Sequence, residues 1–153
     1  MTTETLPEFT PSDVQAQLDE LRFDSFDQSD AYTLGSLAAE LVRENGYALA
    51  IQVVLGDHVV YKSAQGGVSP DTDSWLRRKA AVAVRDSQPS LLTRLNDEGA
   101  GTPLLVDDTY AVSGGAFPLV VGGQVVGTIT ASGLKDVVDH DLVVAALRSF
   151  VAN

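Results

Sequence analysis

Residues 113–132 read SGGAFPLVVGGQVVGTITAS, and this stretch decides the fold. It holds two runs rich in Val, Leu and Ile, 116–121 and 124–132, which are joined by Gly122-Gly123. Runs of this composition are typical of β-strands, and a Gly-Gly pair between two of them is typical of a tight hairpin turn. The stretch therefore predicts an antiparallel hairpin that ends at Gly133.

The same signals occur once more upstream. Tyr47–Leu55 and His58–Ala64 are apolar-rich runs on either side of a Gly56-Asp57 turn, so we predict a second hairpin. Leu104–Val112 is a candidate for one further strand. Apolar residues at helical spacing, with capping residues near their starts, predict helices over about 12–21, 30–44, 73–87, 89–97 and 140–151.

Two hairpins separated by helices predict an α+β fold, with one antiparallel sheet and flanking helices. Profilin-like and PAS-like proteins have this outline. The alternative is a mixed sheet in which one helical connection creates a parallel pair. With 153 residues the chain has the length of one domain. We assign 12–153 to that domain and 1–11, which is polar, acidic and carries two prolines, to a disordered acidic tail.

The composition argues against several classes of function. The formal net charge is −11, from 10 basic and 21 acidic side chains, and such a surface repels nucleic acid and anionic membranes. The chain has no cysteine, which rules out disulfides and zinc–thiolate sites. The N-terminus does not resemble a secretory signal, and no apolar run approaches the roughly 20 residues that span a bilayer. We therefore expect a cytoplasmic protein that binds neither nucleic acid nor membrane.

One cluster of positive charge interrupts this acidic background. Arg77, Arg78, Lys79 and Arg85 lie together on the helix predicted over 73–87. Guanidinium groups bind carboxylates and phosphates through two parallel hydrogen bonds, so the cluster is a candidate anion site for haem propionates or another small acidic ligand. The alternative is that these cations pair with the acidic surface or with a neighbouring subunit. The nearby acids cap the helix or face elsewhere, so we expect at least one arginine to lack a partner within its own helix.

Five short motifs together resemble the haem-degrading-domain family, the group of GlcG-like and HbpS-like proteins. They are Trp75–Ala80 (WLRRKA), Gly114–Leu119 (GGAFPL), Gly122–Gly127 (GGQVVG), Ser132-Gly133, and Asp139 at the start of a helix rich in Ala and Leu. Their order and spacing cover about residues 20–150. Within the family they are most similar to its uncharacterised branch of small stand-alone proteins.

The resemblance implies a profilin-like fold, assembly into rings or other homo-oligomers, and haem binding in some members. The apolar residues of the last helix and of 117–126 exceed what one sheet face requires, which also favours self-association. One position departs from the family. That branch usually has a His before the Gly-Gly-x-Phe-Pro turn, and this chain has Ser113 there, which puts any role of that imidazole in doubt.

Beside the basic cluster we place a candidate ligand pocket that contains Trp75, Ser113, Phe117, Ser132 and His140. Either His140 or His58 could ligate haem iron. A Ser–His–Asp triad does not follow, because the consecutive side chains of Asp139 and His140 point apart and no Gly-x-Ser-x-Gly elbow occurs. The acidic residues match no calcium-loop spacing. We therefore assign no catalytic residue and no metal ligand.

The sequence leaves three hypotheses of function. The favoured one is a non-enzymatic domain that binds haem or another small acidic ligand and acts as a homo-oligomer. The second is a protein–protein interaction or assembly module without a ligand. The third is an enzyme of uncharacterised activity. Haem is the candidate cofactor, and the expected partners are further copies of the chain and a small acidic molecule.

Overall fold

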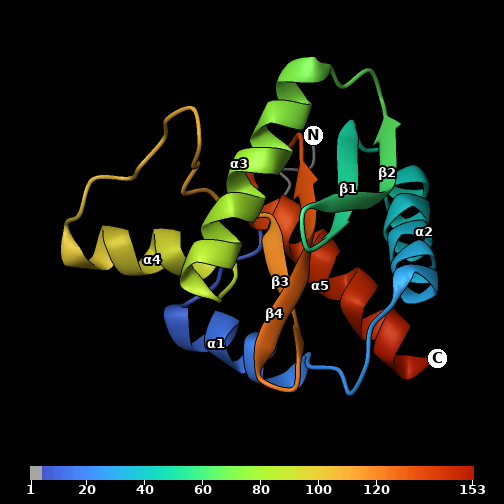
Figure 1. Cartoon of the computed structure of the whole chain (residues 1–153). Helices are drawn as coiled ribbons and strands as arrows, with labels where there is room; N and C mark the ends of the chain where they lie inside the picture. Colours follow the sequence, from blue (N-terminus) through green and yellow to red (C-terminus); the bar gives the residue numbers. More distant parts are fainter. Residues whose placement is uncertain (1–4) are drawn as a thin grey trace.

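The computed structural model describes residues 5–153, and within them the chain forms an α+β fold of five helices and one four-stranded sheet (Figure 1). The predicted fold class is confirmed. In chain order the elements are α1 (Pro11–Glu20), α2 (Gln28–Asn45), β1 (Leu49–Leu55), β2 (His58–Gln65), α3 (Pro70–Asp86), α4 (Ser90–Ala100), β3 (Ala116–Val121), β4 (Gln124–Ser132) and α5 (Asp136–Ala152).

The two predicted hairpins join into a single antiparallel sheet with strand order β2-β1-β4-β3. β1 and β4 are the central strands, and each pairs antiparallel with both of its neighbours. The alternative of a mixed sheet is therefore wrong. The candidate strand over 104–112 is also wrong, because in the described chain it forms only one isolated bridge between Val106 and Ala111.

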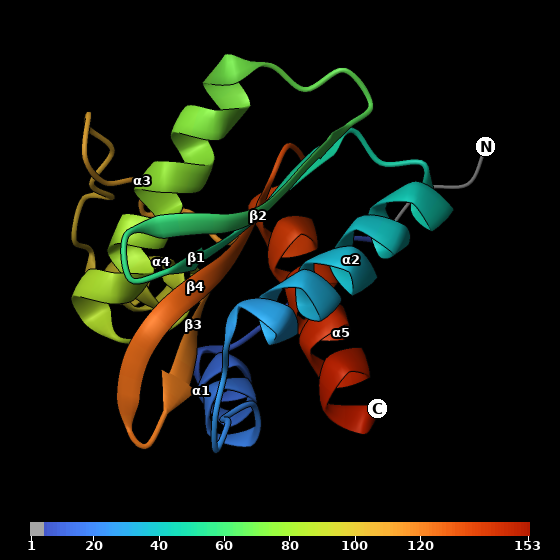
Figure 2. The same cartoon turned by 45° about the vertical axis from the view of Figure 1, so that its right-hand side comes forward.

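Helices cover both faces of the sheet, with α2 and α5 on one face and α3 on the other (Figure 2). Val53, Ile129 and Phe117 are direct cross-strand partners from β1, β4 and β3. All three are fully buried in the main core with residues of α2 and α5. Burying a side chain of this size contributes about 1.5–3 kcal/mol, so this row anchors the central strands.

α3 packs mainly on β4 and β3, with less contact on β1. Its buried residues are Leu76, Lys79, Ala80, Val82 and Ala83. A lysine among four apolar residues is unusual, because lysine is almost never fully buried unless it is paired. The same packing leaves the β1–β2 half of this sheet face less covered than the β3–β4 half.

The structure describes residues 5–11 of the predicted acidic tail. Residues 1–4 of that tail lie outside the described residues. Phe9 packs beside a small cluster with Leu91 and Val14, and its ring meets the His140 ring edge-on at a centroid distance of 5.0 Å. Thr10 caps α1 through a capping box with Asp13. The packed domain therefore includes Phe9, Thr10 and Pro11.

Candidate functional site

The three consecutive cations of α3 lie in three different environments. Arg77 lines a groove beside the sheet, Arg78 lies across the ring of Trp75, and Lys79 is buried under the helix. The helical turn of about 100° per residue directs neighbouring side chains to different sides. The three side chains therefore point to different places and do not line one common hollow.

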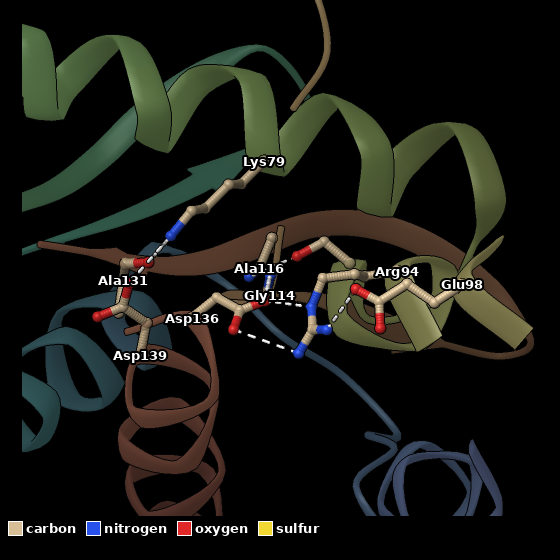
Figure 3. Close-up of polar contacts among 9 residues, drawn as sticks. Lys79, Arg94, Glu98, Gly114, Ala116, Ala131, Asp136 and Asp139 are labelled. Carbon is tan, nitrogen blue, oxygen red and sulfur yellow. Dashed lines mark hydrogen bonds and ion pairs between the residues drawn. The ribbon is translucent and has the colours of Figure 1, made fainter. Parts of the chain in front are cut away.

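Lys79 forms a buried ion pair with Asp139 of α5 (Figure 3). The Nζ–Oδ2 distance is 3.0 Å, and the side chains are 3% and 0% exposed. Nζ also donates to the carbonyl oxygen of Ala131 at 3.2 Å, and Oδ1 of Asp139 accepts the backbone N–H of Leu134 at 3.1 Å. Burial raises the pKa of Asp139, although the Lys79 ammonium acts in the opposite direction.

The turn before β3 is fixed by contacts from three elements (Figure 3). The N–H of Gly114 donates to Asp136 Oδ2 at 2.9 Å, and Asp136 also pairs with Arg94. Gly115 has φ +134°, and a Cβ there would lie 2.3 Å from the Ala131 oxygen and 3.1 Å from Lys79 Nζ. Only glycine fits this position, because a Cβ would overlap the backbone oxygen of Ala131 and the positive φ disfavours other residues.

A pocket of about 310 Å³ opens above Lys79, and we call it the polar pocket. It lies between the first turns of α3, Ser113 and the turn after β4, and it is lined by Asp71, Thr72, Trp75, Lys79, Ser113, Ser132 and residues 133–134. The structure therefore brings together Trp75, Ser113 and Ser132 of the candidate ligand pocket and adds Lys79 from the basic cluster.

A larger hollow of about 800 Å³ lies between α3 and the β1–β2 half of the sheet, and we call it the apolar groove. Its walls include Val54, Val59 and Val84, with Arg77, Arg85 and Tyr110 among the polar residues. Arg77 Nη1 donates to the carbonyl oxygen of Asp108 at 3.0 Å. Arg85 makes two hydrogen bonds with Asp86, and its Cζ lies 4.9 Å from the centroid of the Tyr110 ring.

Arg78 lies outside the residues that line either hollow. Its Cζ is 4.4 Å from the centroid of the Trp75 ring, which is the geometry of a cation–π contact. Its Nε bonds to the oxygens of Ser74, and its Nη1 donates to the carbonyl oxygen of Asp107 at 3.3 Å. Arg78 thus connects α3 to the loop that follows α4.

His140 and Phe117 lie in the core on the opposite face of the sheet, so they do not line the polar pocket. His140 is fully buried, and Nε2 donates to Gln17 Oε1 at 2.7 Å. Nδ1 is buried without a partner among the described residues. Burial lowers the pKa of His140 to about 4, and it is not free to bind a ligand.

Two residues of these sites, Asp139 beside Lys79 and Tyr110 at the apolar groove, are not predicted from the sequence. Asp139 was expected to cap the last helix, but α5 begins at Asp136 with Lys135 as its N-cap, so Asp139 lies within the first turn. The sequence did contain a signal, since Lys79 shares a helix face with Leu76 and Ala83. A lysine on an apolar face requires a buried acid, although the pattern does not say which one.

The described residues do not form a hydrolytic triad or a metal centre. Asp139 pairs with Lys79 and His140 pairs with Gln17, and within the described residues neither makes a hydrogen bond to Ser113 or Ser132. Within residues 5–153 no group of three His, Asp or Glu side chains is placed to hold a metal ion. Over the same residues, no helix is both long and apolar enough to cross a membrane.

Comparison with known proteins points to one family. A family model described as "Haem degrading protein HbpS-like" matches residues 26–148. A UPF0303 protein of Streptomyces coelicolor is 38% identical over 148 residues, which is 93% of this chain and 94% of that protein.

Solved structures share the fold. The crystal structure of Ybr137w superposes with a TM-score of 0.85 at 24% identity, over 95% of this chain and 90% of that one. The crystal structure of a complex of PduOC with haem superposes with a TM-score of 0.68 at 17% identity, over 82% of this chain and 94% of that one. At these identities the likeness concerns the fold.

Proposed function

The chain belongs to the HbpS-like family of haem degrading proteins, and from this premise we propose that it binds a flat, largely apolar molecule that carries carboxylates. Haem is the leading candidate, because a structural relative with the same fold forms a complex with haem. The proposed binding site is the apolar groove, whose volume of about 800 Å³ lies within the usual range of ligand pockets.

The observation that carries this proposal is that, among the described residues, Arg77 has no carboxylate partner. Its guanidinium lies at an apolar groove, and its protein partner is a backbone carbonyl. Within the described residues no carboxylate lies within ion-pair distance of Arg77. A guanidinium that retains its charge and several free N–H donors suits a ligand carboxylate such as a haem propionate.

The groove also offers an oxygen donor for iron. Tyr110 lines the groove, and a tyrosine phenol is one of the side chains that hold haem iron in proteins. No histidine is among the groove residues, and His140 is enclosed in the core. We therefore assign Arg77 to a ligand carboxylate and Tyr110 to the iron, while Arg85 is already paired with Asp86. Bound haem would supply the redox chemistry, and these side chains would bind and orient it.

Titration with haemin tests the proposal. We expect a saturating shift of the Soret band near one haem per chain. Arg77→Ala should weaken binding about tenfold or more, because a hydrogen-bonded charge pair contributes about 1.5–3 kcal/mol. Arg43→Ala is the matched control, since Arg43 is an exposed arginine on α2 that pairs with Glu40. Failure of haemin to saturate, or equal loss in both variants, would overturn the proposal.

A specific observation favours a second candidate function, assembly with further copies of the chain. Val59 and Val84 are 47% and 51% exposed, and both line the apolar groove. Another chain would bury these side chains as well as a ligand would. Light scattering at micromolar concentration separates the two: a mass near one subunit would exclude self-association. If the unmodified protein has the mass of an oligomer, a fall to the mass of one subunit in a Val84→Lys variant would place the interface at the groove.

A further inference from the structure

We propose that the polar pocket is a second binding site, distinct from the apolar groove, for a small uncharged molecule rich in oxygen, such as a polyol or a sugar. The two hollows lie on different sides of α3, and none of their lining residues is shared.

Three polar groups at this pocket have hydrogen-bonding capacity that the protein does not use. An ammonium carries three N–H donors, and Lys79 directs two of them to Asp139 and Ala131. Ser132, which is 5% exposed, and the half-buried Ser113 both line the pocket, and within the described chain neither hydroxyl makes a hydrogen bond. Both hydroxyls and the third ammonium hydrogen are therefore available to a ligand in the pocket that supplies oxygens.

The charge of the pocket argues for an uncharged ligand. Lys79 is the one cation among the lining residues, and it is already in contact with the carboxylate of Asp139. Asp71 adds a second carboxylate to the lining. The summed charge of Lys79, Asp139 and Asp71 is therefore negative, and a ligand carboxylate or phosphate would be repelled. Hydroxyl groups can accept from the ammonium and donate to Asp71 at the same time.

The shape of the pocket suits such a molecule. Its volume of about 310 Å³ is at the lower end of the usual range for ligand pockets. Trp75 forms one wall, and Arg78 is stacked on its ring, so the indole is held in place. The flat face of an aromatic ring accommodates the C–H surface of a small ring or chain while the hydroxyls bond elsewhere.

The polar groups are also held in place before any ligand binds. The turn that carries Ser113 is tied by Gly114 N–H to Asp136 and by Ala116 N–H to Ser90 Oγ at 3.0 Å. Ser132 is the last residue of β4 and pairs with Ala50 of β1. A site with fixed walls loses little conformational entropy on binding, which favours affinity for a small ligand.

Trp75 is the only tryptophan of the chain, so its fluorescence reports directly on this pocket. We would titrate the protein with glycerol, D-ribose and D-glucose, and separately with acetate and inorganic phosphate. We expect a saturable change with at least one of the three uncharged probes, at a midpoint on the order of 1 mM, and none with the two anions.

Ser132→Ala and Ser113→Ala are the decisive variants, because neither hydroxyl bonds within the described protein and the fold should be retained. Each should weaken the response about three- to tenfold, the effect of one lost hydrogen bond. Ser149→Ala, an exposed serine on α5, is the matched control and should leave it unchanged.

Three results would overturn the proposal: no saturation with any uncharged probe, an equal response to acetate and phosphate, or unchanged binding in both serine variants. The result is independent of the haem proposal. Arg77→Ala should leave the response of Trp75 to the uncharged probes unchanged, and Ser132→Ala should leave haemin affinity unchanged.

Discussion

The apolar groove and the polar pocket lie on two sides of one helix, α3. The cation at the groove is exposed, whereas the cation at the pocket is buried and paired with a carboxylate. At the groove, Arg77 keeps its charge accessible and touches only a backbone carbonyl. At the pocket, Lys79 is buried and its charge is balanced by Asp139. Arg77 and Lys79 are two positions apart on α3, yet one is an exposed cation bonded to a backbone carbonyl and the other is a buried member of an ion pair. Burial and the partner, rather than residue type, decide what each cation does.

The largest effect should come from breaking the buried pair. Asp139→Ala leaves the Lys79 ammonium without its carboxylate, so we expect the free energy of unfolding to fall by about 3–5 kcal/mol. Urea denaturation measures this. The matched control is Glu20→Ala, which removes the exposed partner of Arg148 and should cost less than about 1 kcal/mol. Equal losses in the two variants would remove the contrast between buried and exposed cations.

A paired replacement sharpens the same contrast. Lys79→Met combined with Asp139→Leu removes both charges and keeps apolar volume at the two positions. Replacing a buried ion pair in this way is often neutral or stabilising, so the double variant should regain most of the lost free energy of unfolding. A double variant no more stable than Asp139→Ala would mean that the backbone contacts to Ala131 and Leu134 carry the stability instead.

The buried His140 extends the contrast to the other face of the sheet. Its pKa is lowered to about 4 by burial, against an ordinary value near 6.5. Above pH 6.5 the imidazole is neutral in both the folded and the unfolded chain, and its contribution to stability is complete. Between pH 6.5 and 4 the unfolded chain takes up the proton and the folded chain does not, so the free energy of unfolding falls. The loss should be about 3 kcal/mol and should be complete below pH 4.

Denaturation at a series of pH values tests this expectation. His140→Asn should flatten the dependence between pH 6.5 and 4, whereas His58→Asn, at the exposed start of β2, should retain it. Asp136 is the charged group that favours the imidazolium and so acts against the shift. The same slope in all three proteins would show that carboxylates, rather than His140, set the acid limit of the fold.

These differences explain which features the sequence could predict. The hairpins depend on local signals, Gly56-Asp57 and Gly122-Gly123 between apolar runs, and both strand pairs were predicted within two residues of their observed ends. The pairing of Lys79 with Asp139 joins residues 60 positions apart, and no local pattern specifies such a contact. The separation of Arg77, Arg78 and Lys79 depends on which side of α3 meets the sheet. The start of α5 was predicted too late, because Asp139 resembles a capping residue in the sequence.

A substitution in the N-terminal segment should change the free energy of unfolding by a smaller amount. Phe9 packs on the His140 ring from outside α1, so Phe9→Ala should lower the free energy of unfolding by about 1–2 kcal/mol. The nearby Leu6, 44% exposed, is the control, and Leu6→Ala should cost well under half as much. Thermal denaturation compares the two variants. A stability unchanged by Phe9→Ala would favour the disordered tail that the composition of 1–11 predicts.

The smallest effect on stability should come from Arg78, and it separates the two sides of α3 most directly. Its contacts are a cation–π interaction with Trp75, worth about 0.5–1 kcal/mol at an exposed site, and hydrogen bonds to Ser74 and to the Asp107 carbonyl. Arg78→Ala should therefore cost about 1 kcal/mol of stability and change the fluorescence of Trp75. Haemin affinity should change less than about twofold, since Arg78 does not line the groove. Haemin titration of this variant beside Arg77→Ala is the measurement. A tenfold loss in Arg78→Ala would restore the continuous anion site predicted from the sequence, because it would mean that the ligand reaches across α3 to both guanidinium groups.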